Sequence, residues 1–343
     1  MEKESRLCKM TRMERVNQGK NAATNAASDA PGLVGIEIGG TKLQIVAGTG
    51  PGAISRRWRG VVRAELGGPG IQRQILAGLA EVGVADSIHG PRAVGVGFGG
   101  PVDWRTGTIC RSHQIDGWEN FELAEWLRGT TGAPVIVEND ANTGALGEAR
   151  YGAGAGFDPV FYATLGSGVG GGLVVGGNIY HGAPPGEAEF GHLRLGRQGA
   201  TVESRCSGWS IDARVRDMAI TGQAAGFLAA AVARQGSRGC EARHLGPALA
   251  ADDLGARQIL DELAGDLALA LSHVVHLLHP AAIVLGGGLS LIGEPLRLAV
   301  ASALPGQVME AFHPVPAVRL AMLGEDAVPA GALELARRMV EHS

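Results

Sequence analysis

Apolar, β-branched runs of strand length alternate along this chain with longer segments of helical periodicity. Four such runs end directly at glycine clusters, and we interpret each as a strand followed by a tight turn. The clusters span 39–40, 95–100, 166–172 and 286–288. Helical patterns cover 71–82, 121–128, 141–151, 211–220, 254–278 with a possible break, and 331–342. Mixed strands and helices predict an α/β protein with two lobes.

Length and composition agree with a two-lobed globular protein. The 343 residues, 45% of them apolar, provide for about two domains. Residues 1–32 form a polar tail without the apolar stretch of a signal peptide, and no run reaches the length of a membrane span. We expect one lobe at 33–139, completed by a C-terminal helix at about 327–343, and the other at 140–326.

Charge and cysteine usage narrow the class of protein further. With 30 basic and 34 acidic residues, the chain lacks the positive field typical of nucleic-acid binding. The four cysteines are widely separated and form no CxxC pair, which argues against a disulfide framework and a four-sulfur zinc site. We therefore expect a cytoplasmic protein with no nucleic-acid or membrane partner.

The 55 glycines are the most unusual feature of the composition, since average usage is about 7%. Glycine turns after strands are typical of phosphate-binding backbone, although ordinary turn chemistry accounts for single clusters. The segments GVGFGG and GSGVGG match GxGxxG, but neither opens a helix, which argues against a dinucleotide site. A P-loop is absent. The best candidate is the strand, Gly-Gly-Thr, strand pattern near residue 40.

Seven motifs, taken together, resemble the ROK family of repressors and sugar kinases in order and spacing. They are GIEIGGTK (35–42), GVGFGGPVD (95–103), VIVENDAN (135–142), TLGSGVGGGL (164–173), GEAEFGH (186–192), IVLGGGLS (283–290) and LGEDAVPAGAL (323–333). The resemblance runs from residue 33 to about residue 340. It implies the actin-like ATPase fold of sugar kinases and Hsp70, in which two α/β lobes hinge around a cleft.

The resemblance also implies nucleotide-binding residues. The first phosphate loop would contain Gly39, Gly40, Thr41 and Lys42, the second Gly166, Ser167 and Gly168, and the adenosine side Gly286, Gly287 and Gly288. Glu37 stands where the family usually has Asp. The resemblance implies that this carboxylate holds Mg²⁺ through water, and Glu can do so only if there is room for the methylene that it has in addition to Asp.

Asp140 is the candidate general base, because phosphoryl transfer to an alcohol needs a carboxylate that accepts the hydroxyl proton. It follows the apolar strand 135–137, and the resemblance places it beside the primary hydroxyl of a sugar. Asn139 would bind neighbouring hydroxyls. The alternative is that Asp140 only caps the helix that begins at about residue 141.

Three further residues are implied as sugar ligands: Glu189, His192 and Glu203. Many family members also carry three cysteines that join the histidine on a structural zinc ion. Here Arg194, Gly196 and Thr201 occupy those positions, and none supplies a thiolate. The sequence therefore predicts no structural zinc.

The leading hypothesis is an ATP- and Mg²⁺-dependent kinase for the primary hydroxyl of a hexose, with glucose as the first choice of sugar. Polyphosphate as donor, or fructose, mannose or an amino sugar as acceptor, are alternatives. A non-catalytic sugar sensor is a further alternative. A DNA-binding repressor is not expected, because it would need a helix-turn-helix and residues 1–32 show no such pattern. The resemblance also implies a homodimer.

Overall fold

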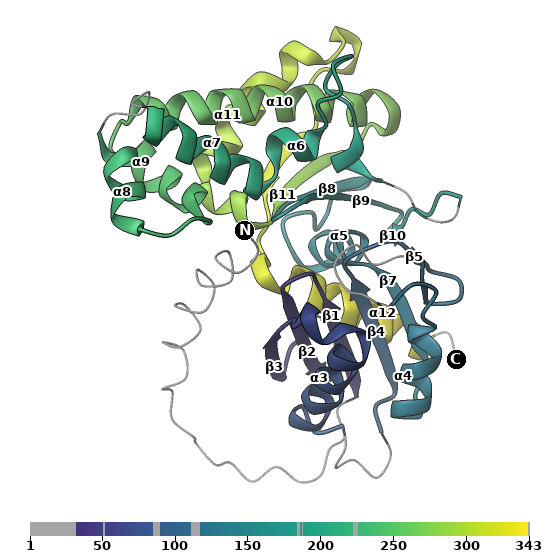
Figure 1. Ribbon diagram of the computed structural model, residues 1–343. Coiled ribbons are helices and arrows are strands. Elements are labelled where there is room, and N and C mark those ends of the chain that lie inside the picture. Colours follow the sequence, from purple (N-terminus) through teal and green to yellow (C-terminus); the bar gives the residue numbers. More distant parts are fainter. Residues whose placement is uncertain are drawn as a thin grey trace. The chain divides into compact units, whose positions relative to one another are not determined.

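The computed structural model describes residues 32–50, 52–84, 90–110, 117–183, 186, 188–221 and 226–341 (Figure 1). The polar tail expected at 1–32 lies, except for its last residue, outside this part of the chain. The chain forms two compact units. Within the described residues, the N-terminal unit comprises 32–162, 171–188 and 322–341, and the C-terminal unit comprises 163–170 and 189–321. In that part of the chain no helix is long and apolar enough to cross a membrane.

A mixed sheet with strand order β3-β2-β1-β4-β7 is the centre of the N-terminal unit. Its strands are β1 (Leu33–Ile38), β2 (Lys42–Gly48), β3 (Arg56–Val61), β4 (Ala93–Phe98) and β7 (Val135–Asn139). β1, β2 and β3 pair antiparallel, whereas β1, β4 and β7 run parallel. The parallel strands therefore end at one edge of the sheet, where ligands bind in open α/β sheets.

Helices cover both faces of this sheet (Figure 1). The unit contains η1 (Ala64–Leu66), α3 (Gly67–Glu81), α4 (Leu123–Thr131), α5 (Asp140–Tyr151), η7 (Gly324–Asp326) and α12 (Ala327–Glu341), together with the hairpin β5 (Val102–Asp103) and β6 (Thr108–Ile109). Alternate residues of β1 point to opposite faces. Val34, Ile36 and Ile38 join the core under α3 and α4, whereas Leu33 packs with Leu333 of α12.

Glycine permits unusually close packing on the α12 face. A Cβ atom added to Gly95 would lie 2.0 Å from the carbonyl oxygen of Ala332, and one added to Gly97 would lie 2.5 Å from Val328 Cγ1. Gly95 and Gly97 therefore belong to strand β4 itself, which corrects the expectation that the whole of 95–100 is a turn after a strand. Only 99–100 follow the strand.

A buried carboxylate joins α12 to α5. Glu334 accepts hydrogen bonds from Arg337 Nε at 2.7 Å, from Arg338 Nε at 2.8 Å and from the Tyr151 hydroxyl. Burial opposes ionisation of Glu334, but the hydrogen bonds from these partners outweigh it and lower the pKa to about 2. The ionised form is therefore the form that stabilises the fold.

We expect Glu334→Gln to lower the free energy of unfolding by about 2 kcal/mol or more near pH 7, because charge-assisted hydrogen bonds are lost in a buried site. A carboxyl whose pKa is depressed contributes stability above its ordinary value of 4.5, and that contribution disappears as pH falls toward about 2. Denaturant unfolding at a series of pH values should therefore show the two proteins converging in acid. A difference that stays constant down to about pH 3 would contradict this account.

The C-terminal unit places helices around the parallel pair β11 (Ala282–Gly286) and β12 (Ala317–Leu320). Strands β8 (Val160–Leu165) and β9 (Val169–Val175) carry the chain between the two units, in a sheet of order β10-β9-β8-β11-β12 with β10 (Asn178–Ile179). The remaining elements are η2 (Phe190–His192), α6 (Val202–Cys206), α7 (Gly208–Thr221), α8 (Phe227–Gln235), η3 (Glu241–His244), α9 (Leu245–Ala250), α10 (Leu254–Leu278), η4 (Gly288–Ile292), α11 (Glu294–Ala303), η5 (Leu304–Gln307) and η6 (Glu310–Phe312).

The division between the units differs from the boundary that we placed at residue 140. Residues 140–162 and 171–188 group with the N-terminal unit, because α5 packs against α12 and β4. The C-terminal helix belongs to the N-terminal unit, as the sequence predicts. Helix α10 is continuous through Leu254–Leu278, so the possible break in that pattern is not present.

Candidate active site

The carboxyl ends of β1, β4 and β7 bring the first glycine turn next to Asp140. In the sheet register, Ile38 pairs with Phe98, and Phe98 pairs with Asn139. The residues that follow are Gly39, Gly99 and Asp140. A Cβ atom added to Gly99 would lie 3.3 Å from Asp140 Oδ2 and 3.4 Å from Gly39 Cα. The missing side chain of Gly99 thus leaves room for the Asp140 carboxylate beside the turn.

Asp140 has an acidity suited to a proton acceptor. Burial, followed by the negative charge of Glu37, raises its pKa to about 7, against an ordinary value of 3.8. The backbone N–H of Ala141 donates to Asp140 Oδ1 at 2.8 Å, and this bond and the positive charge of Lys42 partly oppose the rise. A general base works best when its pKa lies near the operating pH.

The helix cap of α5 is the side chain of Asn139. Its Oδ1 accepts from the N–H groups of Ala141 at 2.9 Å and Asn142 at 3.2 Å, and its Nδ2 donates to the Gly100 carbonyl at 3.2 Å. Asp140 is the first residue of the helix rather than its N-cap. Asn139 therefore fixes the start of α5, and with it the position of the adjacent carboxylate.

Glu37 lies in a chain of polar contacts that crosses β1, β2 and β3. Its Oε1 pairs with Lys42 Nζ at 2.9 Å and its Oε2 accepts from Gln44 Nε2 at 2.8 Å. Gln44 Oε1 in turn accepts from Arg59 Nε at 2.7 Å. Gln44 sits directly opposite Glu37 in the β1–β2 register and is fully buried. The network holds the Glu37 carboxylate in one orientation.

The oxygen donors at this edge fit a magnesium ion that accompanies a nucleotide. Carboxylates are ligands that Mg²⁺ prefers, and it usually retains several waters. Burial, and after it the charge of Glu37, disfavours ionisation of Asp140, whereas the charge of Lys42 favours it. Lys42 and Gln44 already contact both oxygens of Glu37, so this carboxylate would hold Mg²⁺ through a water molecule rather than directly.

The first glycine turn is a compact hairpin. The N–H of Gly39 donates to the Lys42 carbonyl at 2.8 Å, which leads β1 into β2 through Gly40 and Thr41. Its glycine and threonine residues are half-buried. The strand, Gly-Gly-Thr, strand arrangement expected from the sequence is present.

The C-terminal unit places its two glycine turns side by side. Residues 166–168 connect β8 to β9, and Gly208 N donates to the Gly166 carbonyl at 2.7 Å. Gly287 has φ +77°, and a Cβ atom there would lie 2.5 Å from the Leu165 carbonyl carbon. Only glycine fits this contact. A Cβ added to Gly288 would meet no atom within 4 Å, so this backbone is open to a ligand.

Val169 links the expected sugar ligands to the second glycine turn. Its N–H donates to Glu203 Oε2 at 3.0 Å. Its carbonyl oxygen lies 2.2 Å from the position of a Cβ added to Gly191, the residue between Phe190 and His192. Glu189 precedes η2, and His192 N donates to the Glu189 carbonyl at 3.0 Å. The three expected sugar ligands are exposed near the start of β9: Glu189, His192 and Glu203.

A hydrogen-bonded hairpin occupies the segment where relatives of this pattern carry cysteines. Arg194 bridges Thr201, and Leu195 N donates to the Ala200 carbonyl at 2.9 Å. Thr201 and Ser204 form a reciprocal capping box that opens α6. Among the described residues, no three His, Cys, Asp or Glu side chains are grouped as metal ligands.

We expect metal analysis of the purified protein to find no stoichiometric zinc, because this hairpin supplies no thiolate near His192. Dialysis against a chelator should also leave the unfolding temperature unchanged. One zinc ion per chain would contradict the alignment of residues 194 to 206.

Comparison with known proteins identifies the family. The model of the ROK family matches residues 33–339. The chain belongs to the ROK family. It is 32% identical over 305 residues to the glucokinase of Halalkalibacterium halodurans, covering 86% of this chain and 91% of that protein.

Solved ROK structures share the fold. A ROK family glucokinase from Streptomyces griseus, in complex with glucose and AMPPNP, has a TM-score of 0.76 at 31% identity over 89% of this chain and 99% of that chain. A ROK family transcriptional regulator, homologous to the E. coli MLC protein, has a TM-score of 0.78 at 19% identity over 90% of this chain and 79% of its own. The α/β actin-like ATPase fold expected from the sequence is confirmed.

Several aromatic, cysteine and histidine side chains outside the candidate site have structural roles in this ROK protein. Trp118 is 1% exposed and stacks on Phe121, so it is not available to a sugar. Cys206 is a buried apolar residue, and burial raises its pKa to about 12. His276 of α10 accepts the N–H of Met309, and His279, the residue that follows this helix, stacks on Phe312.

Sequence reasoning did not single out Gly99 or Gln44. Gly99 was visible only as one glycine of a cluster, and its role follows from the register of three parallel strands. Gln44 is a polar residue in the apolar strand KLQIVAG, opposite Glu37. A buried polar side chain needs a partner, so its place in that pattern was the available signal.

Proposed function

We propose that this ROK protein transfers the terminal phosphoryl group of ATP to the primary hydroxyl of a hexose, with glucose as the first candidate. The observation that carries the proposal is the Asp140 carboxylate, whose pKa is raised to about 7, at the common edge of three parallel strands and beside the first glycine turn. The glucokinases among the relatives support the same reaction.

In the proposed reaction, Asp140 accepts the proton of the sugar hydroxyl as its oxygen forms a bond to the terminal phosphorus. The bond from that phosphorus to the bridging oxygen breaks, and ADP leaves with the electron pair. Phosphoryl transfer demands positioning and charge stabilisation more than covalent chemistry. When bound, Mg²⁺ supplies positive charge to the phosphate oxygens.

The other residues have binding roles in this proposal. Backbone N–H groups of the first turn (Gly39, Gly40, Thr41) and of residues 166–168 bind phosphate oxygens. The turn 286–288 receives the adenosine. Lys42 holds Glu37, and Asn139 holds the start of α5 and with it Asp140. Glu189, His192 and Glu203 are exposed and bind sugar hydroxyls: the two carboxylates accept hydrogen bonds, and the imidazole can donate or accept one.

A test of this function measures ADP release by purified protein with ATP, Mg²⁺ and each of a panel of sugars. Glucose, mannose, fructose, N-acetylmannosamine and N-acetylglucosamine cover the alternatives, and a parallel series replaces ATP with polyphosphate. We expect sugar-dependent ADP release with at least one hexose. No release above the sugar-free background with any of them would favour the sugar sensor instead.

The proposal predicts a pH dependence that Glu37 controls. Turnover should rise with pH through about 7, because Asp140 must be ionised to accept a proton. Burial raises the pKa of Asp140 most and the charge of Glu37 adds to it, so Glu37→Gln should move the rising limb of kcat to lower pH without restoring the ordinary pKa.

The matched control for this pH series is Glu325→Gln, which removes an exposed carboxylate that pairs with Arg59, the partner of Gln44, and that is not named among the causes of the Asp140 shift. Its pH profile should superimpose on that of the wild type. An unmoved profile in Glu37→Gln, with measurable turnover, would contradict the assignment of the titrating group to Asp140.

A further inference from the structure

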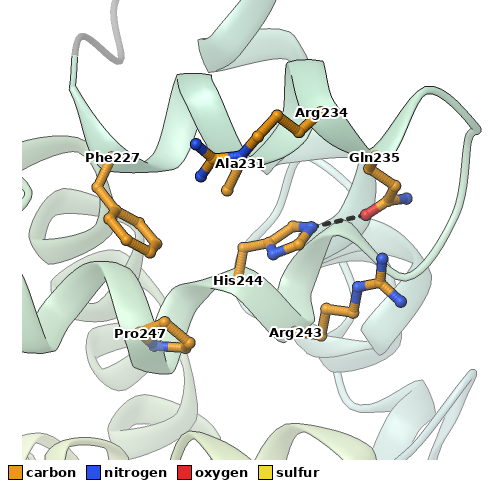
Figure 2. A pocket seen from close by; sticks show the side chains of 7 residues that line it. All are labelled: Phe227, Ala231, Arg234, Gln235, Arg243, His244 and Pro247. Atoms are coloured by element: carbon orange, nitrogen blue, oxygen red, sulfur yellow. Dashed lines mark hydrogen bonds between the residues drawn. The ribbon is translucent and has the colours of Figure 1, made fainter.

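A cavity of about 300 Å³ lies within the C-terminal unit, and none of the residues assigned above lines it (Figure 2). Helix α8 provides one wall and the segment η3–α9 the other. The lining residues are Phe227, Ala231, Arg234, Gln235, Arg243, His244 and Pro247. The four lining residues of α8 are spaced i, i+4, i+7 and i+8, so they lie on one face of that helix.

The lining combines cationic groups with apolar surface. Two guanidinium groups and one imidazole face the cavity, and none of the described residues that line it is acidic. The Phe227 ring, 40% exposed, lies at the opposite end of the cavity from Gln235 in Figure 2, with the Pro247 ring below it. Guanidinium groups match the geometry of phosphate and carboxylate oxygens.

Hydrogen bonds fix the polar end of the cavity and the protonation of its histidine. Gln235 Nε2 donates to the carbonyls of Ser237 at 2.9 Å and Gly239 at 2.6 Å, so the amide oxygen is the atom that faces His244. The distance from Gln235 Oε1 to His244 Nε2 is 2.7 Å. Since that oxygen only accepts, Nε2 carries a proton. The titrating atom is therefore Nδ1, on the other side of the ring (Figure 2).

Two arginines and one glutamate act on the charge of the imidazole in opposite directions. Burial, then the charge of Arg243, lowers the pKa of His244, and Arg234 adds to the effect, whereas Glu241 raises it. Glu241 is buried and pairs with Arg216 Nη1 at 2.8 Å. A bound anion would relieve this repulsion and favour a proton on Nδ1.

We propose that this cavity binds a small phosphate monoester with an apolar body, at a site separate from the residues proposed for phosphoryl transfer. A phosphate monoester is largely a dianion near neutral pH, which matches two guanidinium groups and a histidine that becomes protonated on binding. The apolar body of the ligand packs on Phe227, Ala231 and Pro247. A cavity of this size suits a ligand with one ring.

The segment that forms the second wall also packs against η4, which begins at Gly288 of the proposed adenosine turn. A Cβ added to Gly246 of α9 would lie 3.8 Å from the Ile292 carbonyl oxygen. Residues of η4 do not line the cavity. Because no residue of the proposed adenosine turn lines the cavity, we expect that an occupant of one site need not displace an occupant of the other.

The test is calorimetric titration with phenyl phosphate in phosphate-free buffer, with inorganic phosphate and phenol as comparison ligands. Arg234→Gln should weaken phenyl phosphate binding at least about tenfold, because a charge-assisted contact is lost. The matched control is Arg238→Gln. Arg238 is exposed between α8 and η3 and does not line the cavity, so this variant should bind phenyl phosphate as tightly as the wild type does. Both arginines are exposed, so unfolding temperatures should be unchanged.

A second readout follows His244 by NMR. Phenyl phosphate should raise the pKa of His244, the signal of which is identified by its absence in His244→Gln, and a saturating non-hydrolysable ATP analogue should not prevent the rise. Several outcomes would overturn the proposal: equal binding by wild type and Arg234→Gln, equal affinity for phenol, equal affinity for inorganic phosphate, or displacement by the ATP analogue. None of these readouts depends on kinase activity, so they remain interpretable if the proposed function fails.

Discussion

Replacing Asp140 with Asn is expected to lower kcat for sugar phosphorylation at least about a hundredfold, the lower range for loss of a positioned general base. The amide has nearly the same shape, and it retains an oxygen to accept the N–H of Ala141. It has no lone pair basic enough to take the hydroxyl proton. Sugar affinity should change little, because Asp140 acts on a proton rather than carrying the binding energy. Steady-state kinetics and sugar titration measure the two effects separately.

The stability of this variant keeps the test interpretable. Because the folded protein raises the pKa of Asp140 above its ordinary value, it disfavours the ionised carboxylate, and stability falls as pH rises toward 7. Neutral Asn removes that penalty, so Asp140→Asn should be at least as stable as wild type near pH 8. Asp103→Asn is the matched control, since the side chain of Asp103 accepts the N–H of Arg105 at the end of β5, a bond that the Asn oxygen can also accept, and its turnover should remain near wild type. A folded Asp140→Asn protein with wild-type kcat would contradict the assignment.

Gly331→Ala is expected to be among the most destabilising single-methyl additions in this protein. The added Cβ would lie 1.8 Å from the Thr143 carbonyl oxygen and 3.1 Å from Gly147 N, where α12 crosses α5. Both neighbours are helix backbone, which moves only if the whole helix shifts. We expect a loss of about 3 kcal/mol or more in the free energy of unfolding, the upper range for overpacking.

Gly265→Ala is the matched control for this change. Gly265 also lies inside a helix, α10, but a Cβ there meets no atom within 4 Å. The same substitution should therefore raise stability by about 0.5–1 kcal/mol through helix propensity alone. Denaturant unfolding of both variants measures the difference. A Gly331→Ala protein as stable as Gly265→Ala would show that α5 and α12 are not packed as closely as described.

Much of the secondary structure could be predicted from periodicity. The segments predicted as helical at 71–82, 141–151 and 254–278 correspond to α3, α5 and α10. Their ends differ most where capping or tertiary contact decides them: α12 begins at Ala327 rather than near residue 331. The earlier start is stabilised by packing on β1 and β4, which local sequence does not specify.

The glycines show why pattern alone was incomplete. We interpreted the clusters as turns that approach a phosphate, and 39–40 and 166–168 are turns. Gly95 and Gly97 instead leave space for α12, and Gly172 leaves space for α5, since its added Cβ would lie 2.7 Å from Ala145 Cβ. A sequence records that a side chain is missing but not which neighbour fills the space.

The candidate site, too, could be predicted from the sequence only in part. Asp140, Glu203 and the glycine turns were proposed from the order of the motifs, and their roles stay predictions. The capping role of Asn139 and the contact between Gln44 and Glu37 depend on side-chain positions that arise only when the strands pair. The elevated pKa of Asp140 likewise results from burial and from a charge on another strand.

The most direct test of the central claim is to identify the product of the wild-type protein by ³¹P and ¹³C NMR, with ATP, Mg²⁺ and ¹³C-labelled glucose or the best sugar of the panel. ADP release alone does not distinguish transfer from hydrolysis. The proposal predicts a phosphate monoester on the primary carbon, formed in equal amount to ADP and at least about a hundredfold more slowly by Asp140→Asn. Inorganic phosphate as the only product, phosphate on a secondary hydroxyl, or equal product formation by the Asn variant would contradict it.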